Sequence, residues 1–121
     1  MPTIRLTPAS ENAIICDHAA LFPATDFTFL DKDTGLPIDL TDYEADLEVF
    51  EVNGGALTLE WHTSDDTITR EGADTNIFRL AEKSDTEMAA IAAKTYAYNF
   101  WVYPTGTSRV KFSYGKFIVS A

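Results

Sequence analysis

Residues 96–103 place apolar side chains on both faces of an extended segment, and no other stretch constrains the fold as strongly. Successive side chains of a β-strand point to opposite faces. One face receives Tyr96, Tyr98, Phe100 and Val102, and the other receives Ala97, Asn99, Trp101 and Tyr103. A strand that is apolar on both faces belongs inside a sheet. We therefore expect a central strand of a β-sandwich.

A short helix is predicted immediately before this strand. Ser84 and Glu87 have the capping-box spacing, in which each side chain can bind the backbone N–H of the other residue. Met88, Ile91 and several alanines follow at helical spacing. The predicted helix spans about residues 85–93.

The chain returns through a strand that should direct Val110, Phe112 and Tyr114 inward and Arg109, Lys111 and Ser113 outward. Beyond Gly115 the apolar positions change parity, to Phe117 and Val119. One extra residue in the strand would cause this change, so a β-bulge is predicted at Gly115.

A second hairpin is predicted around Asn53-Gly54-Gly55, because these residues tolerate the positive φ of tight turns. Further strands are expected around Phe27–Phe29, 67–69 and 76–81. Together the segments predict a mainly β fold, an immunoglobulin-like antiparallel β-sandwich of about seven to nine strands with one short helix. A chain of 121 residues is expected to form a single domain over 1–121, with 1–24 as a candidate N-terminal arm.

The charge lies unevenly along the chain. Its formal net charge is -10, and residues 1–60 hold twelve acidic and two basic side chains. Nucleic-acid backbones and anionic membrane surfaces require clustered Lys and Arg, so neither is an expected partner. The single cysteine, Cys16, cannot form an intrachain disulfide, which fits folding in a reducing cytoplasm.

The segments Phe27-Thr28-Phe29, Gly35 to Tyr43, Tyr96 to Phe100 and Gly115 to Val119 resemble those of a known family. They are similar to the small immunoglobulin-like β-sandwich proteins of tailed bacteriophages, above all the N-terminal domains of upper baseplate proteins. The resemblance covers about residues 26–119. It implies a virion structural protein that folds in the host cytoplasm before assembly. Residues 1–25 lie outside it and could contact a neighbouring subunit.

Three residue patterns raise the question of a metal or catalytic site. Asp31-x-Asp33-x-Gly35 resembles the start of a calcium loop, but its glycine is at the wrong position, so a β-turn is expected. Cys16 and His18 lack an adjoining oxyanion site, so a structural cysteine is expected. His62 stands alone on the polar side of its strand. We expect no catalytic residue, no metal and no cofactor.

The most notable predicted surface feature is an acidic strand, which has Asp42, Glu44, Asp46 and Glu48 along one face. Like charges along one face repel each other unless a partner offsets them. They are either a solvated face or a docking surface for the basic segment of a neighbouring copy. Trp101 and Tyr103, if they face outward, are further interface candidates. The candidate residues are Asp42, Glu44, Asp46, Glu48, Trp101, Tyr103, Arg109, Lys111 and Lys116.

These observations predict a non-enzymatic structural protein of a tailed-phage virion. A tail or baseplate-proximal adaptor is favoured over a capsid decoration protein. Its expected partners are other virion proteins and copies of itself, with no nucleic acid, membrane or small-molecule substrate. The alternative from another class is a carbohydrate-binding β-sandwich module, which would stack sugars on exposed Trp61 and Trp101.

Overall fold

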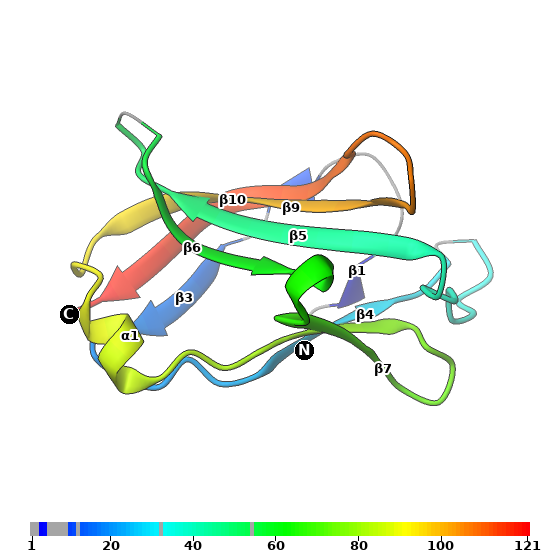
Figure 1. Ribbon diagram of the computed structural model, residues 1–121, viewed down its shortest axis with the longest axis horizontal. Coiled ribbons are helices and arrows are strands. Elements are labelled where there is room, and N and C mark those ends of the chain that lie inside the picture. The colour runs from blue at the N-terminus through cyan, green and yellow to red at the C-terminus, as the bar shows by residue number, and fades with distance from the viewer. Residues whose placement is uncertain (1–2, 5–9, 12, 32, 54) are drawn as a thin grey trace.

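The protein is a sandwich of two β-sheets, seen in a computed structural model that describes residues 3–4, 10–11, 13–31, 33–53 and 55–121 (Figure 1). The four-stranded sheet has the order β1 (Thr3–Ile4), β4 (Thr25–Phe29), β8 (Ile77–Leu80), β7 (Ile68–Glu71). In the six-stranded sheet, β2 (Ser10–Glu11) and β3 (Ile14–Asp17) both pair with β10 (Lys111–Ser120), followed by β9 (Thr95–Pro104), β5 (Tyr43–Phe50) and β6 (Leu57–His62). The predicted β-sandwich is confirmed.

Most strand pairs are antiparallel, and β9 pairs with β10 on one side and β5 on the other, as expected for a central strand. The exceptions come from the first residues of the chain, because β1 runs parallel to β4, and β2 and β3 run parallel to β10. Phe22 is buried in the core. The described part of residues 1–24 thus lies against its own sandwich, and a contact of this arm with a neighbour stays a prediction.

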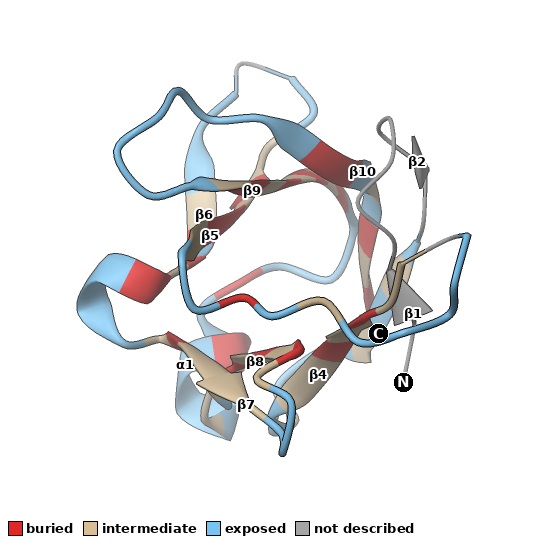
Figure 2. Cartoon of the chain, turned by 90° about the vertical axis from the view of Figure 1, so that its right-hand side faces the viewer, coloured by how far each residue is buried: buried red, intermediate tan, exposed pale blue. Residues whose placement is uncertain are grey.

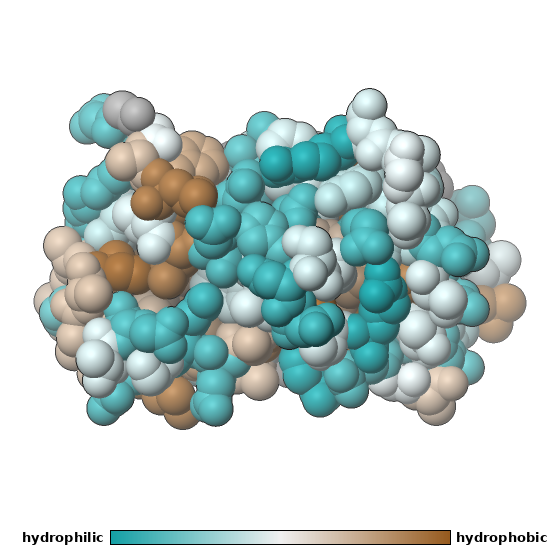
Figure 3. All heavy atoms as spheres, in the orientation of Figure 1, coloured by the Kyte–Doolittle hydropathy of each residue, from teal (hydrophilic) through white to brown (hydrophobic). Residues whose placement is uncertain are grey.

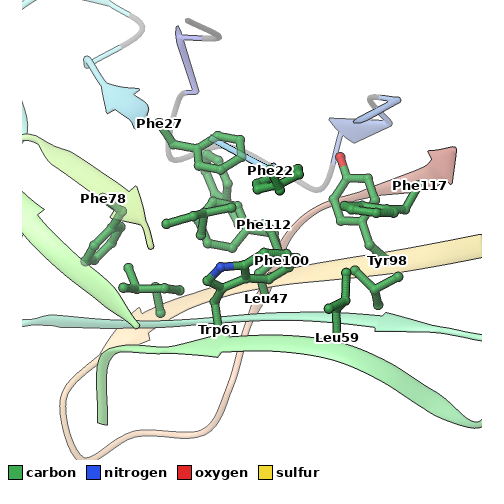
Figure 4. Close-up of a cluster of buried hydrophobic side chains, with 14 of the residues drawn as sticks. Phe22, Phe27, Leu47, Leu59, Trp61, Phe78, Tyr98, Phe100, Phe112 and Phe117 are labelled. Atoms are coloured by element: carbon green, nitrogen blue, oxygen red, sulfur yellow. The ribbon is translucent and has the colours of Figure 1, made fainter. Parts of the chain in front are cut away.

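Aromatic side chains from both sheets fill the space between them. Phe27 of β4 lies 4.8 Å from Phe100 of β9, measured between ring centroids, and Phe112 lies 5.2 Å from Phe29. Trp61 is fully buried, and its indole N–H donates to the carbonyl oxygen of Ala81 at 2.8 Å. Figure 4 shows the rings of Phe27, Phe100, Phe112 and Trp61 converging, and Figure 2 shows buried positions along the strands of both layers.

The predicted capping box is present at the start of α1 (Asp85–Ala89). Glu87 N–H donates to Ser84 Oγ, and Ser84 N–H donates to Glu87 Oε1, each at 3.1 Å. The helix is shorter than the predicted 85–93, because the chain leaves it at Ala90 and buries Ile91 in the core. Core packing here outweighs the helical propensity of the alanines.

The predicted bulge at Gly115 is wrong in its position. The register shift lies between Lys111, opposite Trp101, and Ser113, opposite Phe100, so Phe112 is the extra residue. Phe112 and Ser113 are both buried, whereas Val110 and Tyr114 are exposed. The inward orientation predicted for Val110 and Tyr114, and the outward one for Ser113, are therefore wrong. The bulge lets Phe112 reach the core while Ser113 Oγ lies 3.3 Å from the Tyr98 hydroxyl.

Replacing Phe100 by alanine should lower the free energy of unfolding by about 3–5 kcal/mol, the usual cost of emptying a buried phenylalanine site. The control Tyr114→Ala, on the outer face of β10, should cost about 1 kcal/mol or less. Urea unfolding followed by tryptophan fluorescence measures both. Equal losses for the two variants would contradict the described core.

Candidate functional site

The acidic strand β5 separates two environments. Ala45, Leu47 and Val49 are buried between the sheets. Glu44, Asp46 and Glu48 alternate with them and lie on the outer side of the six-stranded sheet. The predicted alternation is confirmed, and the question becomes what offsets the repulsion between three adjacent carboxylates.

Asp46 is the centre of the polar network on this outer side, which we call the Asp46 network. Asp46 is buried, with only 7% of its surface exposed. Oδ1 lies 2.7 Å from Nδ1 of His62, and Oδ2 accepts a hydrogen bond from the Tyr103 hydroxyl at 2.8 Å. Arg109 Nε lies 3.7 Å from Oδ2. Burying this carboxylate is tolerated because β6, β9 and the segment before β10 each supply a partner.

His62 does not stand alone, as the sequence suggested. It lies between two carboxylates, with Nδ1 facing Asp46 and Nε2 at 2.6 Å from Glu60 Oε1. Partial burial disfavours the charged ring, but the hydrogen bonds to Asp46 and Glu60 outweigh it and raise the pKa of His62. The two ring nitrogens can donate at the same time only when the ring is an imidazolium. A ring between two carboxylates therefore favours the imidazolium form.

Tyr103 is a neutral hydrogen-bond donor to the same carboxylate. Burial and the hydrogen bond to Asp46 raise the pKa of Tyr103 to about 12. The phenol thus remains a donor at neutral pH. Tyr103 acts as a fixed structural group of the Asp46 network.

Glu48 has its own pair of partners. Arg109 Nη2 lies 2.6 Å from Glu48 Oε1, and the Trp101 indole N–H donates to the same oxygen at 3.3 Å. The Arg109 guanidinium stacks 4.2 Å from the Trp101 ring centroid, and the Lys111 ammonium lies 5.5 Å from it. Cation–π contact and ion pairing thus hold the basic segment against the acidic strand of the same molecule.

Glu44 is joined to the other sheet. Arg70 of β7 lies 3.4 Å from Glu44 Oε1 and donates to the backbone carbonyls of Leu40 and Tyr43. The hydroxyl of Thr63, in the 3₁₀-helix η1 (Thr63–Asp65), also donates to Glu44. Arg70 therefore links the two layers at their edge.

The structure brings most of the predicted interface residues together, apart from Asp42 and Lys116. Asp42 is exposed in the turn before β5, and Lys116 lies further along β10 beside Ala97. The acid–base contact predicted between copies is formed by Arg109 within one molecule. Pairing between copies stays a prediction.

The other sequence patterns have structural explanations. Asp31 Oδ1 accepts from the backbone N–H groups of Asp33 and Thr34 at 2.8 and 3.0 Å, which confirms the predicted turn. Burial, with a smaller effect of Asp17, raises the pKa of the Cys16 thiol, so the thiolate is disfavoured. No group of three metal-binding side chains occurs within the described residues. Nor does that part of the chain contain a helix of the length and apolarity needed to cross a bilayer.

Sequence reasoning missed His62, Glu60 and Arg70 as members of this surface. The predicted hairpin could have indicated the contact of His62 with Asp46. These two residues are equally distant in sequence from position 54, and the structure pairs them across β5 and β6. Glu60 follows from His62, since residues two apart share a face. Arg70 comes from the opposite sheet, and no local pattern indicates its contact.

The structure resembles solved structures, although no protein-family model and no curated protein sequence matches the chain. One similar structure is the N-terminal domain of phage TP901-1 ORF48, with a TM-score of 0.54 and 12% identity over 98% of this chain and 95% of that one. Extracellular domains 3–5 of Drosophila OTK match with a TM-score of 0.33 and 15% identity, over 96% of this chain and 35% of that one. The first likeness confirms, for the fold, the expected resemblance to a phage β-sandwich domain.

The stability of the protein should depend on the charge of His62. Folding raises the pKa of His62, so the charged ring stabilises the folded state. This stabilisation is fully present at pH values below the pKa of the unfolded chain, about 6.5. It is lost as the pH rises through the pKa of the folded protein. Urea unfolding across neutral pH should show this loss in the wild type and not in His62→Gln. Parallel pH profiles would contradict it.

Glu48 and Arg109 should be energetically coupled within one molecule. A double-mutant cycle with Glu48→Gln and Arg109→Gln is expected to give about 0.5–1 kcal/mol, since both side chains are partly solvated. Glu48→Gln and Lys116→Gln form the control pair, and their effects on the free energy of unfolding should be additive. A coupling of zero for the first pair in monomeric protein would refute the contact.

Proposed function

We propose that this chain is a non-enzymatic structural protein of a tailed-phage virion, acting as a tail or baseplate-proximal adaptor. It would be present in several copies and work through contacts with other virion proteins and with copies of itself. On this proposal it folds in the host cytoplasm and is then built into the particle. Its role is geometric, since the sandwich holds side chains at fixed positions for neighbouring subunits.

One observation carries the proposal: the fold likeness to the N-terminal domain of phage TP901-1 ORF48 extends over nearly the whole of both chains. Partial matches between β-sandwiches are common because few layer architectures exist. A match that leaves little of either chain uncovered is more specific. It agrees with the resemblance in turns and strands that the sequence indicates.

The arrangement of the polar residues also supports a structural role. The carboxylates of the Asp46 network bind partners in the same chain, and Tyr103 and His62 are held by hydrogen bonds. A general acid or base would instead need a group poised to exchange a proton with a bound substrate. The network is better suited to fixing the strands than to chemistry.

The carbohydrate-binding alternative loses support from the two tryptophans. Trp61 is fully buried in the core, so it offers no surface for a sugar ring. Trp101 lies under the Arg109 guanidinium and near the Lys111 ammonium. The two tryptophans are therefore not exposed together as a pair of sugar-stacking rings.

Quantitative mass spectrometry of purified virions of the encoding phage, separated into heads and tails, tests the proposed function. We expect the chain in the tail fraction at several copies per particle. Recovery only with heads would favour a capsid decoration protein. Absence from both fractions would refute a virion role.

A further inference from the structure

Resting on the proposed multi-copy role, we propose that copies of this chain associate head to tail. The segment around Val110 of one molecule would enter the groove between α1 and the β5–β6 hairpin of the next. The partner is thus a second copy of the chain. The interface would use two different surfaces of each molecule.

The groove is an apolar depression at one end of the sandwich. It has a volume of about 570 Å³ and is lined by residues from β6, α1 and the segment after α1. Leu59, Ile91 and Tyr96 form its buried floor, while Ala90 and Ala92 are exposed. Val52 and Leu57 of the adjoining hairpin are also exposed. Figure 3 shows apolar side chains gathered at this end, in contrast to the hydrophilic middle of the same view.

The rim of the groove is acidic. Glu87 lines it, and Asp85 lies on the same short helix. Neither carboxylate forms an ion pair with any residue that the structure describes. Glu51 also lines the groove but already binds Lys94 at 2.6 Å. The groove therefore suits an apolar side chain with a basic neighbour.

Charge and exposure together select the occupant among the exposed apolar residues outside the groove. Leu21 has no Asp, Glu, Lys or Arg within three positions, and Tyr114, between Lys111 and Lys116, is the least exposed of the set at 37%. Ile15 and Leu36 have only acidic charges beside them in sequence, at Asp17 and at Asp33 and Asp39. Val110, which is 56% exposed, stands between Arg109 and Lys111. Within the described residues Lys111 contacts aromatic rings and no carboxylate, so its charge remains available to Glu87 of a neighbour.

The fold also presents Val110 in a suitable way. Its carbonyl oxygen accepts the Val102 N–H at 3.0 Å, which ties the segment to β9. Figure 1 shows the β9–β10 loop at the opposite end of the long axis from α1 and the β5–β6 hairpin. One molecule therefore cannot fill its own groove. Contacts between unlike surfaces extend into closed rings or open filaments.

Sedimentation velocity over a range of concentrations tests the association. The wild-type chain should form species larger than a dimer as concentration rises. Val110→Asp and Ala90→Arg should each weaken self-association by about 10-fold to 100-fold, the factor for losing one buried valine side chain. Ile15→Asp, an equally drastic change at a more exposed site, is the matched control and should associate like the wild type.

Mixing the two defective variants gives the decisive result. Val110→Asp keeps an intact groove and Ala90→Arg keeps an intact Val110 segment, so together they should form a 1:1 dimer and nothing larger. Circular dichroism would verify that each variant is folded. A wild-type chain that stays monomeric up to about 1 mM, a range that includes weak contacts, would overturn the proposal, as would a mixture that stays monomeric.

The virion measurement distinguishes failure of this contact from failure of the proposed function. A monomeric chain that is nevertheless found in tails would refute only the head-to-tail contact. An associating chain that is absent from virions would refute only the virion role.

Discussion

The packing of Phe100 and its aromatic neighbours between the two sheets is the interaction on which the rest of the structure depends. Phe100 is fully buried on β9, the strand that pairs with both β5 and β10. Phe27 and Phe29 reach it from the opposite sheet, and Phe112 reaches it from the next strand. Large rings bury much apolar area, so one such layer can hold together a domain of this size. The positions of the outward side chains are set by this core, because they lie on the same strands.

The same strands that fill the core also arrange the polar side. Because β5 places alternate residues on opposite faces, fixing Leu47 inward fixes Asp46 outward. β9 places Tyr103 beside Asp46 and Trp101 beside Glu48 for the same reason. The acidic strand thus has partners within its own chain, and its docking against a neighbouring copy stays a prediction. Because these charges are largely balanced within the chain, we propose the two ends of the sandwich as the surfaces for neighbours.

Much of the fold could be predicted from the sequence, because local physics determined it. The alternation in β5 and β9, the capping box at Ser84 and the hairpin near Asn53 each depend on neighbouring residues only. The predictions failed where tertiary packing decided the outcome. The bulge lies at Phe112 because that ring enters the core, and an apolar residue such as Val110 does not reveal its face by type alone. Arg70 reaches Glu44 from the other sheet, a contact that alternation within strands cannot indicate.

We propose that the rigid sandwich serves as a virion subunit by packing its two ends against neighbours. A cryo-electron microscopy map of the intact virion of the encoding phage tests this most directly. We expect density for the sandwich in the tail, with the groove beside α1 covered by another subunit and the Asp46 network intact. Its absence from the map, or subunits that contact only the acidic outer face of β5 and leave both ends bare, would contradict it.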